Sequence, residues 1–365
     1  MRVLETILVG GLLAASFGHA ASQLRLGSVL GEEGGGFARA EERRAFHFPD
    51  DHGPHPEYRS EWWYLTASLT SESGDHYGVQ FTLFRQALRP EPVMGGPWDA
   101  SQVYLAHLAL TDVAAERHWQ SERLSRGHPR LAGAVSAPFR AYLENWALSA
   151  PGPDLAGLRL EGSAGEFAVA LELDPQKPIV LQGDAGLSAK GPGQASYYYS
   201  LPRLSARGEI RVDGRVATVT GTGWLDREWS TSVLGAGQTG WDWFSLQLDS
   251  GDDLMVFQLR NRRGVRDPYD QGVWVEPGGE SRQLRTQDFT LEALRYWQDS
   301  DGTEWPVAWR VAVMAPEGPR QLEVRAAVDD QLMETLLTYW EGMVWVYDEA
   351  GRRIGTGYME LTGYD

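Results

Sequence analysis

Two short aromatic stretches, Glu61-Trp62-Trp63-Tyr64 and Trp241-Asp242-Trp243-Phe244, open strand-like segments about 180 residues apart in this chain. Each is followed by alternating polar and apolar residues, a turn rich in Ser, Gly and Asp, and a second run that ends in an arginine, Arg85 or Arg260. Alternation with a period of two is typical of β-strands, and its recurrence indicates a duplicated β-domain. Tryptophan pairs carry more apolar surface than the start of a strand needs, so we expect each copy to line a cavity or an interface.

Strand signals recur at short, regular spacing around both stretches, with breaks rich in Gly, Asp, Ser and Pro. About eight such segments lie between residues 62 and 225, and about eight more between residues 243 and 362. Closing a sheet into a barrel removes the edge strands that an all-β chain otherwise has to protect, and a barrel of about eight strands is wide enough to hold one small ligand. The sequence therefore predicts an all-β fold with two antiparallel barrels or strongly curved sheets.

Length and composition agree with this interpretation and restrict the partners. A chain of 365 residues suffices for about two domains. Its 42 Gly, 15 Trp and 14 Tyr favour strands and turns over helices. The 33 Lys and Arg against 50 Asp and Glu give a net charge of −17, which argues against nucleic acid or an anionic membrane as partner. We expect a soluble protein with a small apolar or neutral ligand.

The first twenty residues have the pattern of a secretory signal peptide. A basic start, Met1-Arg2, precedes a short apolar stretch and the small residues of Gly18-His19-Ala20, which predicts cleavage after Ala20. No segment approaches the ~18 uninterrupted apolar residues of a membrane span, so we expect no stable membrane insertion. The sequence contains no cysteine, and therefore neither a disulfide nor a lipoprotein anchor. We expect a periplasmic or secreted protein.

These patterns divide the chain into four segments. Residues 1–20 are the predicted signal peptide, and residues 21–44, rich in Gly, Glu and Arg, are a predicted flexible lead. Residues 45–235 and 236–365 are the predicted N-terminal and C-terminal barrel domains.

The segment between the two strand series concentrates charged and aromatic side chains. It reads Gly221-Thr222-Gly223-Trp224-Leu225-Asp226-Arg227-Glu228-Trp229. One interpretation is a strand end whose carboxylates pair with Arg227 or with other basic groups. The other is a carboxylic acid among aromatic rings, where desolvation raises the pKa and keeps the group able to donate a proton. Spacing alone leaves both open.

A second cluster, residues 48–61, contains residue types that can bind a metal ion. It holds two histidines among acidic residues, namely His52, His55, Asp51, Glu57 and Glu61. Such residues bind metals, but the prolines and the glycine of this segment predict a rigid loop, so the spacing does not place both imidazoles on one face. We predict no metal site here, and expect a loop that folds over a barrel mouth and is pinned by Arg59 and carboxylates.

Other motif matches fail on their context. Residues 235–240 fit the glycine pattern of a dinucleotide-binding loop, but that motif must open a helix and here a strand follows. The chain has no Gly-x-Ser-x-Gly elbow, no phosphate-binding loop and no His-Glu-x-x-His motif. We predict no cofactor, and a serine hydrolase is disfavoured.

Three motifs together resemble the AttH/CrtC superfamily: residues 48–53 with 61–64, the central 221–229, and the terminal 357–364. That superfamily includes carotenoid 1,2-hydratase, proteins similar to kievitone hydratase, fungal pericyclases, and exported bacterial members labelled only as predicted secreted hydrolases. The resemblance extends over nearly all of the mature chain. It implies two lipocalin-like antiparallel β-barrel domains packed side by side, with a ligand cleft near their interface.

The resemblance also implies a proton donor. In the hydratase branch the aspartate of the central motif protonates an isoprenoid double bond, and by position that role falls on Asp226. The branch has a tyrosine where this chain has Trp224, so the match covers the acid and not this neighbour. Protonation leaves a carbocation that aromatic faces stabilise while water is held back. We predict Asp226 as catalytic, with Glu61 or His52 orienting a water. The predicted ligand-binding residues are Trp62, Trp63, Tyr64, Arg59, Trp224, Trp229, Trp241 and Trp243.

Three functions stay open on the sequence. The first is an exported lipocalin-like protein that binds an apolar, isoprenoid-type or lipid-like small molecule and hydrates or isomerises it through Asp226. The second is a non-catalytic carrier, in which the acidic cluster forms an interdomain salt bridge. The third is a metal-dependent hydrolase that uses His52 and His55.

Overall fold

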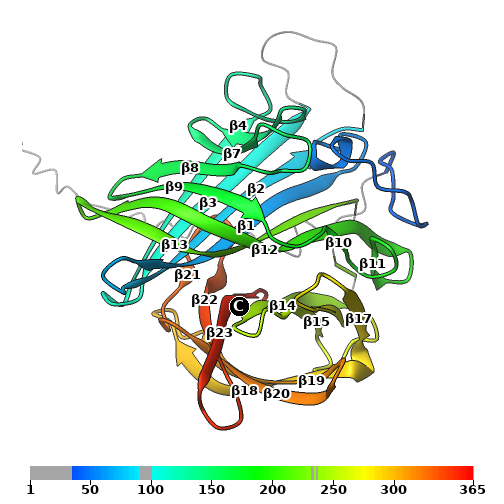
Figure 1. The fold of residues 1–365 in the computed structure, drawn as a ribbon. Helices are drawn as coiled ribbons and strands as arrows, with labels where there is room; N and C mark the ends of the chain where they lie inside the picture. Colours follow the sequence, from blue (N-terminus) through cyan, green and yellow to red (C-terminus); the bar gives the residue numbers. More distant parts are fainter. Residues whose placement is uncertain (1–34, 91–100, 232–233, 236, 365) are drawn as a thin grey trace, which may run out of the picture.

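The structure is a computed structural model that describes residues 35–90, 101–231, 234–235 and 237–364. The predicted signal peptide and most of the predicted lead lie outside these residues. Nearly all of the regular structure is β-strand, and the only helical elements among the described residues are two 3₁₀ turns, η1 (Asp50–His52) and η2 (Thr286–Asp288). No helix in this part of the chain has the length and apolar character needed to cross a bilayer. The predicted all-β class is confirmed (Figure 1).

The first sheet is antiparallel and contains thirteen strands in the order β4-β3-β2-β1-β13-β12-β9-β8-β7-β6-β5, with β10 and β11 also pairing with β12. The strands are β1 (Ser60–Ser71), β2 (His76–Ala87), β3 (Gln102–Asp112), β4 (Arg117–Arg126), β5 (Ala132–Ser136), β6 (Phe139–Leu143), β7 (Trp146–Ala150), β8 (Leu158–Ala164), β9 (Phe167–Pro175), β10 (Val180–Leu181), β11 (Leu187–Gly191), β12 (Gln194–Val212) and β13 (Arg215–Ser230). The sheet curves until β6 contacts β2, β3 and β4.

The second sheet is also antiparallel and forms a nearly closed barrel of ten strands. Its order is β17-β16-β15-β14-β23-β22-β20-β19-β18, with β21 paired to β22. The strands are β14 (Gln238–Leu248), β15 (Asp253–Asn261), β16 (Gln271–Val275), β17 (Ser281–Arg285), β18 (Phe289–Gln298), β19 (Glu304–Ala315), β20 (Gly318–Ala326), β21 (Leu332–Met333), β22 (Tyr339–Tyr347) and β23 (Arg353–Leu361). The predicted boundary at residues 235 and 236 lies between β13 and β14.

The structure contains more strands than the sequence predicts. Short strands such as β10 are too brief to produce a periodic signal, and irregular segments hide them. Two predicted strands, 205–212 and 217–225, belong to longer strands, β12 and β13, that pair along most of their length.

Each curved sheet is filled with apolar side chains rather than hollow. Leu65, Phe81 and Trp146 lie in the core enclosed by the first sheet. Phe244 and Trp340 lie in the core of the second. A third apolar cluster, outside both cores, contains side chains from both sheets. Neither interior is therefore available as the ligand-holding lumen that the strand count suggested.

The two sheets meet through their outer faces. Strands β1, β2 and β12 of the first sheet contact β23, β22 and β14 of the second (Figure 1). A buried ion cluster crosses the junction, because Asp253 on β15 pairs with Lys177 at 2.7 Å and with Arg203 at 2.7 Å. These contacts fix the orientation of the outer faces toward one another.

Candidate functional site

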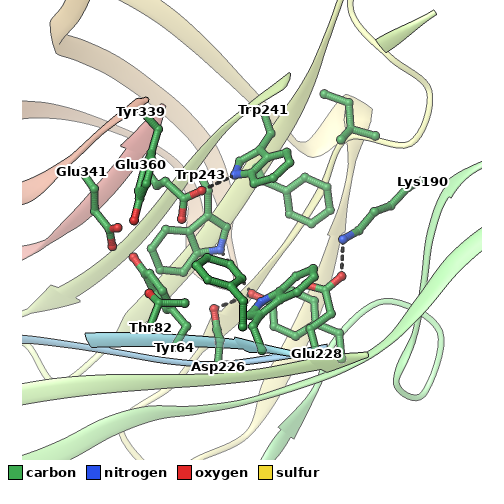
Figure 2. Close-up of a pocket in the computed structure, with 15 residues that line it drawn as sticks. Tyr64, Thr82, Lys190, Asp226, Glu228, Trp241, Trp243, Tyr339, Glu341 and Glu360 are labelled. Atoms are coloured by element: carbon green, nitrogen blue, oxygen red, sulfur yellow. Dashed lines mark hydrogen bonds and ion pairs between the residues drawn. The ribbon is translucent and has the colours of Figure 1, made fainter. Parts of the chain in front are cut away.

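A cavity of about 70 Å³ lies where the outer faces of the two sheets meet (Figure 2). The first sheet lines it from β1, β2, β11, β12 and β13, and the second from β14, β15, β22 and β23. Its aromatic walls are Trp62, Tyr64, Phe84, Tyr198, Trp241, Trp243, Phe257 and Tyr339. Its charged or acidic side chains are Lys190, Asp226, Glu228, Glu341 and Glu360. A small, mostly apolar space with a few converging polar groups has the character of a ligand site.

Strand alternation delivers these side chains to the cavity. Successive side chains of a strand point to opposite faces of its sheet. On β1, Leu65 points into the first core while Tyr64 faces the cavity. On β14, Phe244 points into the second core while Trp243 faces the cavity. The rings of Tyr64 and Trp243 meet edge to face, with centroids 5.3 Å apart.

Asp226 is buried and accepts three hydrogen bonds. The hydroxyl of Tyr198 donates to Oδ2 at 2.6 Å, and Nε1 of Trp224 donates to Oδ1 at 2.7 Å. The hydroxyl of Ser200 donates to Oδ1 as well. Burial raises the pKa of Asp226 to about 7, although the three donors lower it. The neighbouring Glu228 carboxyl adds to the upward shift. The group therefore titrates near neutrality.

The two hydroxyls that contact Asp226 are themselves oriented by further donors. Nε1 of Trp243 donates to the Tyr198 oxygen at 3.2 Å. Nε2 of Gln182 donates to the Ser200 oxygen at 2.8 Å. Since each hydroxyl oxygen already receives an N–H group, its own proton points to Asp226.

Two further carboxyl groups, Glu341 and Glu360, enter the cavity from the second sheet (Figure 2). Glu360 accepts a hydrogen bond from Nε1 of Trp241 at 2.8 Å. Burial raises its pKa to about 7, and the nearby carboxyls of Asp226 and Glu228 add to the shift. Glu341 is buried, and the hydroxyls of Tyr64 and Tyr339 are its polar neighbours. Among the described residues, however, neither of its oxygens receives a well-aligned hydrogen bond. Burial, together with the Glu360 carboxyl, raises the pKa of Glu341 well above its ordinary value.

One basic side chain balances part of this acidity. Lys190 forms an ion pair with Glu228, which also accepts a hydrogen bond from the hydroxyl of Ser196. The ammonium nitrogen lies 5.7 Å from the ring centroid of Trp62 and 5.9 Å from that of Phe257. The cavity therefore has a charged end at Lys190 and protonatable carboxyls elsewhere on its wall (Figure 2).

The structure brings five of the predicted site residues to this cavity: Trp62, Tyr64, Asp226, Trp241 and Trp243. Trp224 does not line the cavity but supports Asp226 through its indole N–H. These residues come from both halves of the chain, as the aromatic repeat suggested.

The other predicted residues do not line the cavity. Glu61 and Trp63 lie on the opposite face of β1, where Glu61 pairs with Arg85 and Arg227. The guanidinium of Arg227 lies 3.8 Å from the ring centroid of Trp63. Glu61 therefore belongs to a buried ion cluster inside the first sheet, where it cannot orient a water at Asp226.

The histidine loop belongs to the same interior. His52 Nδ1 lies 2.6 Å from the hydroxyl of Tyr199, and the His55 ring stacks on Trp229 with centroids 3.8 Å apart. Arg85 and Arg227 donate hydrogen bonds to backbone carbonyls of this loop and so hold it in place. Arg59 and His52 are absent from the cavity wall. Across the described ranges, no three His, Asp or Glu side chains are grouped to hold a metal ion.

Sequence reasoning missed several cavity residues, namely Lys190, Tyr198, Glu228, Tyr339, Glu341 and Glu360. One of them had a clear signal. Gly221-Thr222-Gly223-Trp224-Leu225-Asp226 recurs as Gly355-Thr356-Gly357-Tyr358-Met359-Glu360. The strand registers agree, because Tyr64 pairs with Asp226 on β13 as Trp243 pairs with Glu360 on β23. The two acids are equivalent positions of the duplicated domain.

Comparisons with known proteins gave a match to one family model and similarity to solved structures. A family model described as AttH-like matches residues 39–364. The crystal structure of a candidate AttH protein from Nitrosomonas europaea is 34% identical, covers 90% of this chain and 100% of its own, and superimposes with a TM-score of 0.80. The comparison with curated proteins gave no match.

Two further solved structures share the fold. Kievitone hydratase from Nectria haematococca is 15% identical, with 87% of this chain and 93% of its own covered and a TM-score of 0.67. CghA is also 15% identical, with 92% and 97% covered and a TM-score of 0.52. At this identity the likeness concerns the fold, which is the predicted lipocalin-like architecture.

Proposed function

The chain belongs to the AttH-like family, and we propose that it binds an apolar small molecule in the cavity between its two sheets and adds or shifts a proton on it, in a hydration or an isomerisation. The observation that carries this proposal is the cavity wall. Aromatic rings surround three carboxyl groups, those of Asp226, Glu341 and Glu360, whose pKa values burial raises to neutrality or above. Displaced carboxyl pKa values in a cleft are typical of acid–base sites.

The chemistry fits these groups. Hydration of an isolated double bond begins when a carboxylic acid protonates one carbon, which leaves a carbocation at the other. The faces of Trp62, Trp243 and Tyr64 supply negative π-density beside such a cation. A water molecule then attacks the cation, and a carboxylate takes up the proton that this water releases. An isomerisation uses the same two groups without the water.

The dimensions suggest the class of ligand. A volume of about 70 Å³ accommodates the reacting part of a molecule and a water, but not a whole isoprenoid chain. Trp62, Phe84 and Trp241 are the aromatic lining residues that stay partly exposed, so we propose that a longer apolar ligand would extend past them. The fold shared with kievitone hydratase, a hydratase by name, adds support for this class of reaction.

A non-catalytic carrier is the second candidate. The three hydrogen bonds on Asp226 favour it, because such bonds also suit a carboxyl that only holds β12 and β13 in place. A carrier would need the aromatic walls and no proton transfer.

One experiment separates these candidates. Small molecules extracted from the purified protein are identified by mass spectrometry, and binding of each is measured by quenching of tryptophan fluorescence. Conversion is then followed in the wild type and in Asp226→Asn. An enzyme converts a bound compound, and Asp226→Asn abolishes conversion while binding persists. A wild type that binds a compound tightly and returns it unchanged would contradict the proposed reaction and favour the carrier.

We also propose that the protein is exported, on the pattern of residues 1–20. N-terminal sequencing of protein recovered from the periplasm or the medium should then start at Ala21. Recovery of the whole pool inside the cell with Met1-Arg2 intact would contradict export.

A further inference from the structure

We infer that Glu341 is the proton donor of the cavity and that Asp226 is the proton acceptor, because Asp226 accepts three hydrogen bonds whereas Glu341 receives no well-aligned hydrogen bond from the described residues. The inference rests on the proposed function for its catalytic meaning. It reverses the role that the central motif suggests for Asp226, and it gives a role to an acid outside that motif.

Asp226 is surrounded by protons that point toward it. The indole N–H of Trp224 can only donate. The hydroxyls of Tyr198 and Ser200 also donate to Asp226, since their oxygens receive N–H groups from elsewhere. A carboxylate can accept all three hydrogen bonds, whereas the added proton of a protonated Asp226 would compete with one of the three donors. The arrangement therefore favours the ionised form, which is the form that accepts a proton.

Glu341 has the opposite surroundings. The hydroxyl of Tyr339 is near it, yet that hydroxyl lies 2.7 Å from Nδ1 of His107. Nε2 of His107 lies 3.0 Å from Glu122, which also accepts the backbone N–H of Leu336 at 3.0 Å. A His107 ring that carries a single proton holds it on Nε2 toward Glu122, and its Nδ1 then accepts from Tyr339. The Tyr339 proton is thereby turned away from Glu341. Among the described residues this leaves the nearby Tyr64 hydroxyl as a donor for a Glu341 carboxylate, against three hydrogen bonds on Asp226.

The neighbouring strand adds a second reason. Glu341 on β22 lies directly opposite Glu360 on β23 in the strand register. Two negative charges at directly opposed positions destabilise a sheet, so one of these carboxyls keeps its proton. Glu360 accepts the indole N–H of Trp241 at 2.8 Å, which stabilises its charged form. Glu341 receives no well-aligned hydrogen bond from the described residues, and the shared proton therefore stays on Glu341.

The duplication makes the contrast plain. Tyr198 and Tyr339 occupy equivalent places, each two residues before the residue that faces an acid across the strand pair. That facing residue is Ser200 in the first half and Glu341 in the second. Tyr198 donates to Asp226 in the cavity, whereas the Tyr339 hydroxyl lies 2.7 Å from Nδ1 of His107, a residue that does not line the cavity. One half of the cavity therefore stabilises a base and the other an acid.

The resulting step balances. The Glu341 O–H bond breaks as the π-electrons of the ligand form a C–H bond, which leaves a Glu341 carboxylate and a carbocation. A water oxygen bonds to the cation and gives one proton to the Asp226 carboxylate. Return of that proton from Asp226 to Glu341, directly or through solvent, restores both groups and leaves one water added to the double bond.

Infrared spectroscopy of the full-length protein at pH 8.5 tests the assignment without any ligand. The wild type should show the C=O band of a buried, protonated carboxylic acid. Glu341→Gln should remove this band, whereas Asp226→Asn and Glu360→Gln should retain it. Glu292→Gln, which changes an exposed glutamate on β18, is the matched control and should leave the spectrum unchanged in this region. Loss of the band in Asp226→Asn or Glu360→Gln, with retention in Glu341→Gln, would overturn the inference.

A second measurement needs no variant at the cavity acids. Nitrogen-15 shifts of the His107 ring in the wild type should report a neutral imidazole with its proton on Nε2. A proton on Nδ1 would mean that Tyr339 is free to donate to Glu341, and would also overturn the assignment. Both measurements are independent of turnover. A protein that shows the Glu341 band but converts no extracted compound would contradict the proposed function and leave the location of the proton intact.

Discussion

Replacement of Glu61 by Gln tests whether this residue belongs to the structure or to the reaction. Its carboxylate contacts two guanidiniums, with Nη2 of Arg227 at 2.5 Å and Nε of Arg85 on the other oxygen. All three side chains are at most 1% exposed. Removing one partner of a buried ion pair typically costs about 3–5 kcal/mol, because the remaining charge stays buried without its counter-charge. Since the whole fold of a typical domain is stable by about 5–15 kcal/mol, this loss is large.

The assay is equilibrium unfolding in urea at pH 7, followed by tryptophan fluorescence. We expect Glu61→Gln to lose about 3–5 kcal/mol of unfolding free energy. Glu292→Gln, which breaks the exposed pair with Arg310, should lose less than about 1 kcal/mol. A Glu61→Gln variant within about 1 kcal/mol of the wild type would refute the buried-cluster argument. Loss of ligand binding in folded Glu61→Gln would show that Glu61 does reach the ligand.

The pH dependence provides an internal check on the same variant. Burial opposes ionisation of Glu61, but Arg85 and Arg227 overcome it and hold its pKa well below the ordinary value. A depressed folded pKa stabilises the fold above the unfolded pKa of about 4.3, and this contribution is lost as the pH falls toward the folded pKa. The difference between wild type and Glu61→Gln should therefore shrink below about pH 4.

Two further predictions concern the central motif. Burial raises the folded pKa of Asp226 to about 7, so the wild type should lose up to about 4 kcal/mol relative to Asp226→Asn as the pH rises from 4 to 8. Urea unfolding at both pH values measures this difference, and a constant difference would contradict the shift. Gly221→Ala should destabilise the fold more than Gly223→Ala. A Cβ at Gly221 would overlap the Ser68 carbonyl oxygen of β1, whereas at Gly223 it meets first the flexible end of Leu173 at 2.9 Å. Thermal unfolding ranks the two, and equal melting temperatures would be the contrary result.

The fold class could be predicted from the sequence because most strands keep a period of two and the aromatic stretch of residues 61–64 recurs at 241–244. The position of the site could not. Alternation separates Trp62 and Tyr64 from Glu61 and Trp63, but it does not tell which pair faces a core and which faces the other sheet. Almost every residue of β1 is buried, so the polarity pattern that normally distinguishes inside from outside is lost.

Of the two cavity acids Glu360 and Glu341, only the first could have been identified from the sequence. The sequence could have identified Glu360, because Glu360 occupies the position in the second Gly-Thr-Gly motif that Asp226 occupies in the first. The environment of Glu341 could not be predicted in this way. It depends on His107, which is 232 positions from its partner Tyr339, and on the way β2 and β22 come together. Contacts of this kind follow from the docking of the two sheets, which local periodicity does not encode.

Duplication explains why an acid and a base can face each other in so small a space. Docking two related sheets through the same outer face brings equivalent positions together, so Asp226 and Glu360 converge with Tyr198 and Tyr339 on one cavity. Two identical halves would give each carboxyl the same surroundings and the same tendency to ionise. The halves differ where Ser200 is replaced by Glu341. There a hydroxyl that donates to a carboxylate gives way to a carboxyl that receives no well-aligned hydrogen bond from the described residues. This divergence, together with the contact between His107 and Tyr339, separates the protonation states of Asp226 and Glu341.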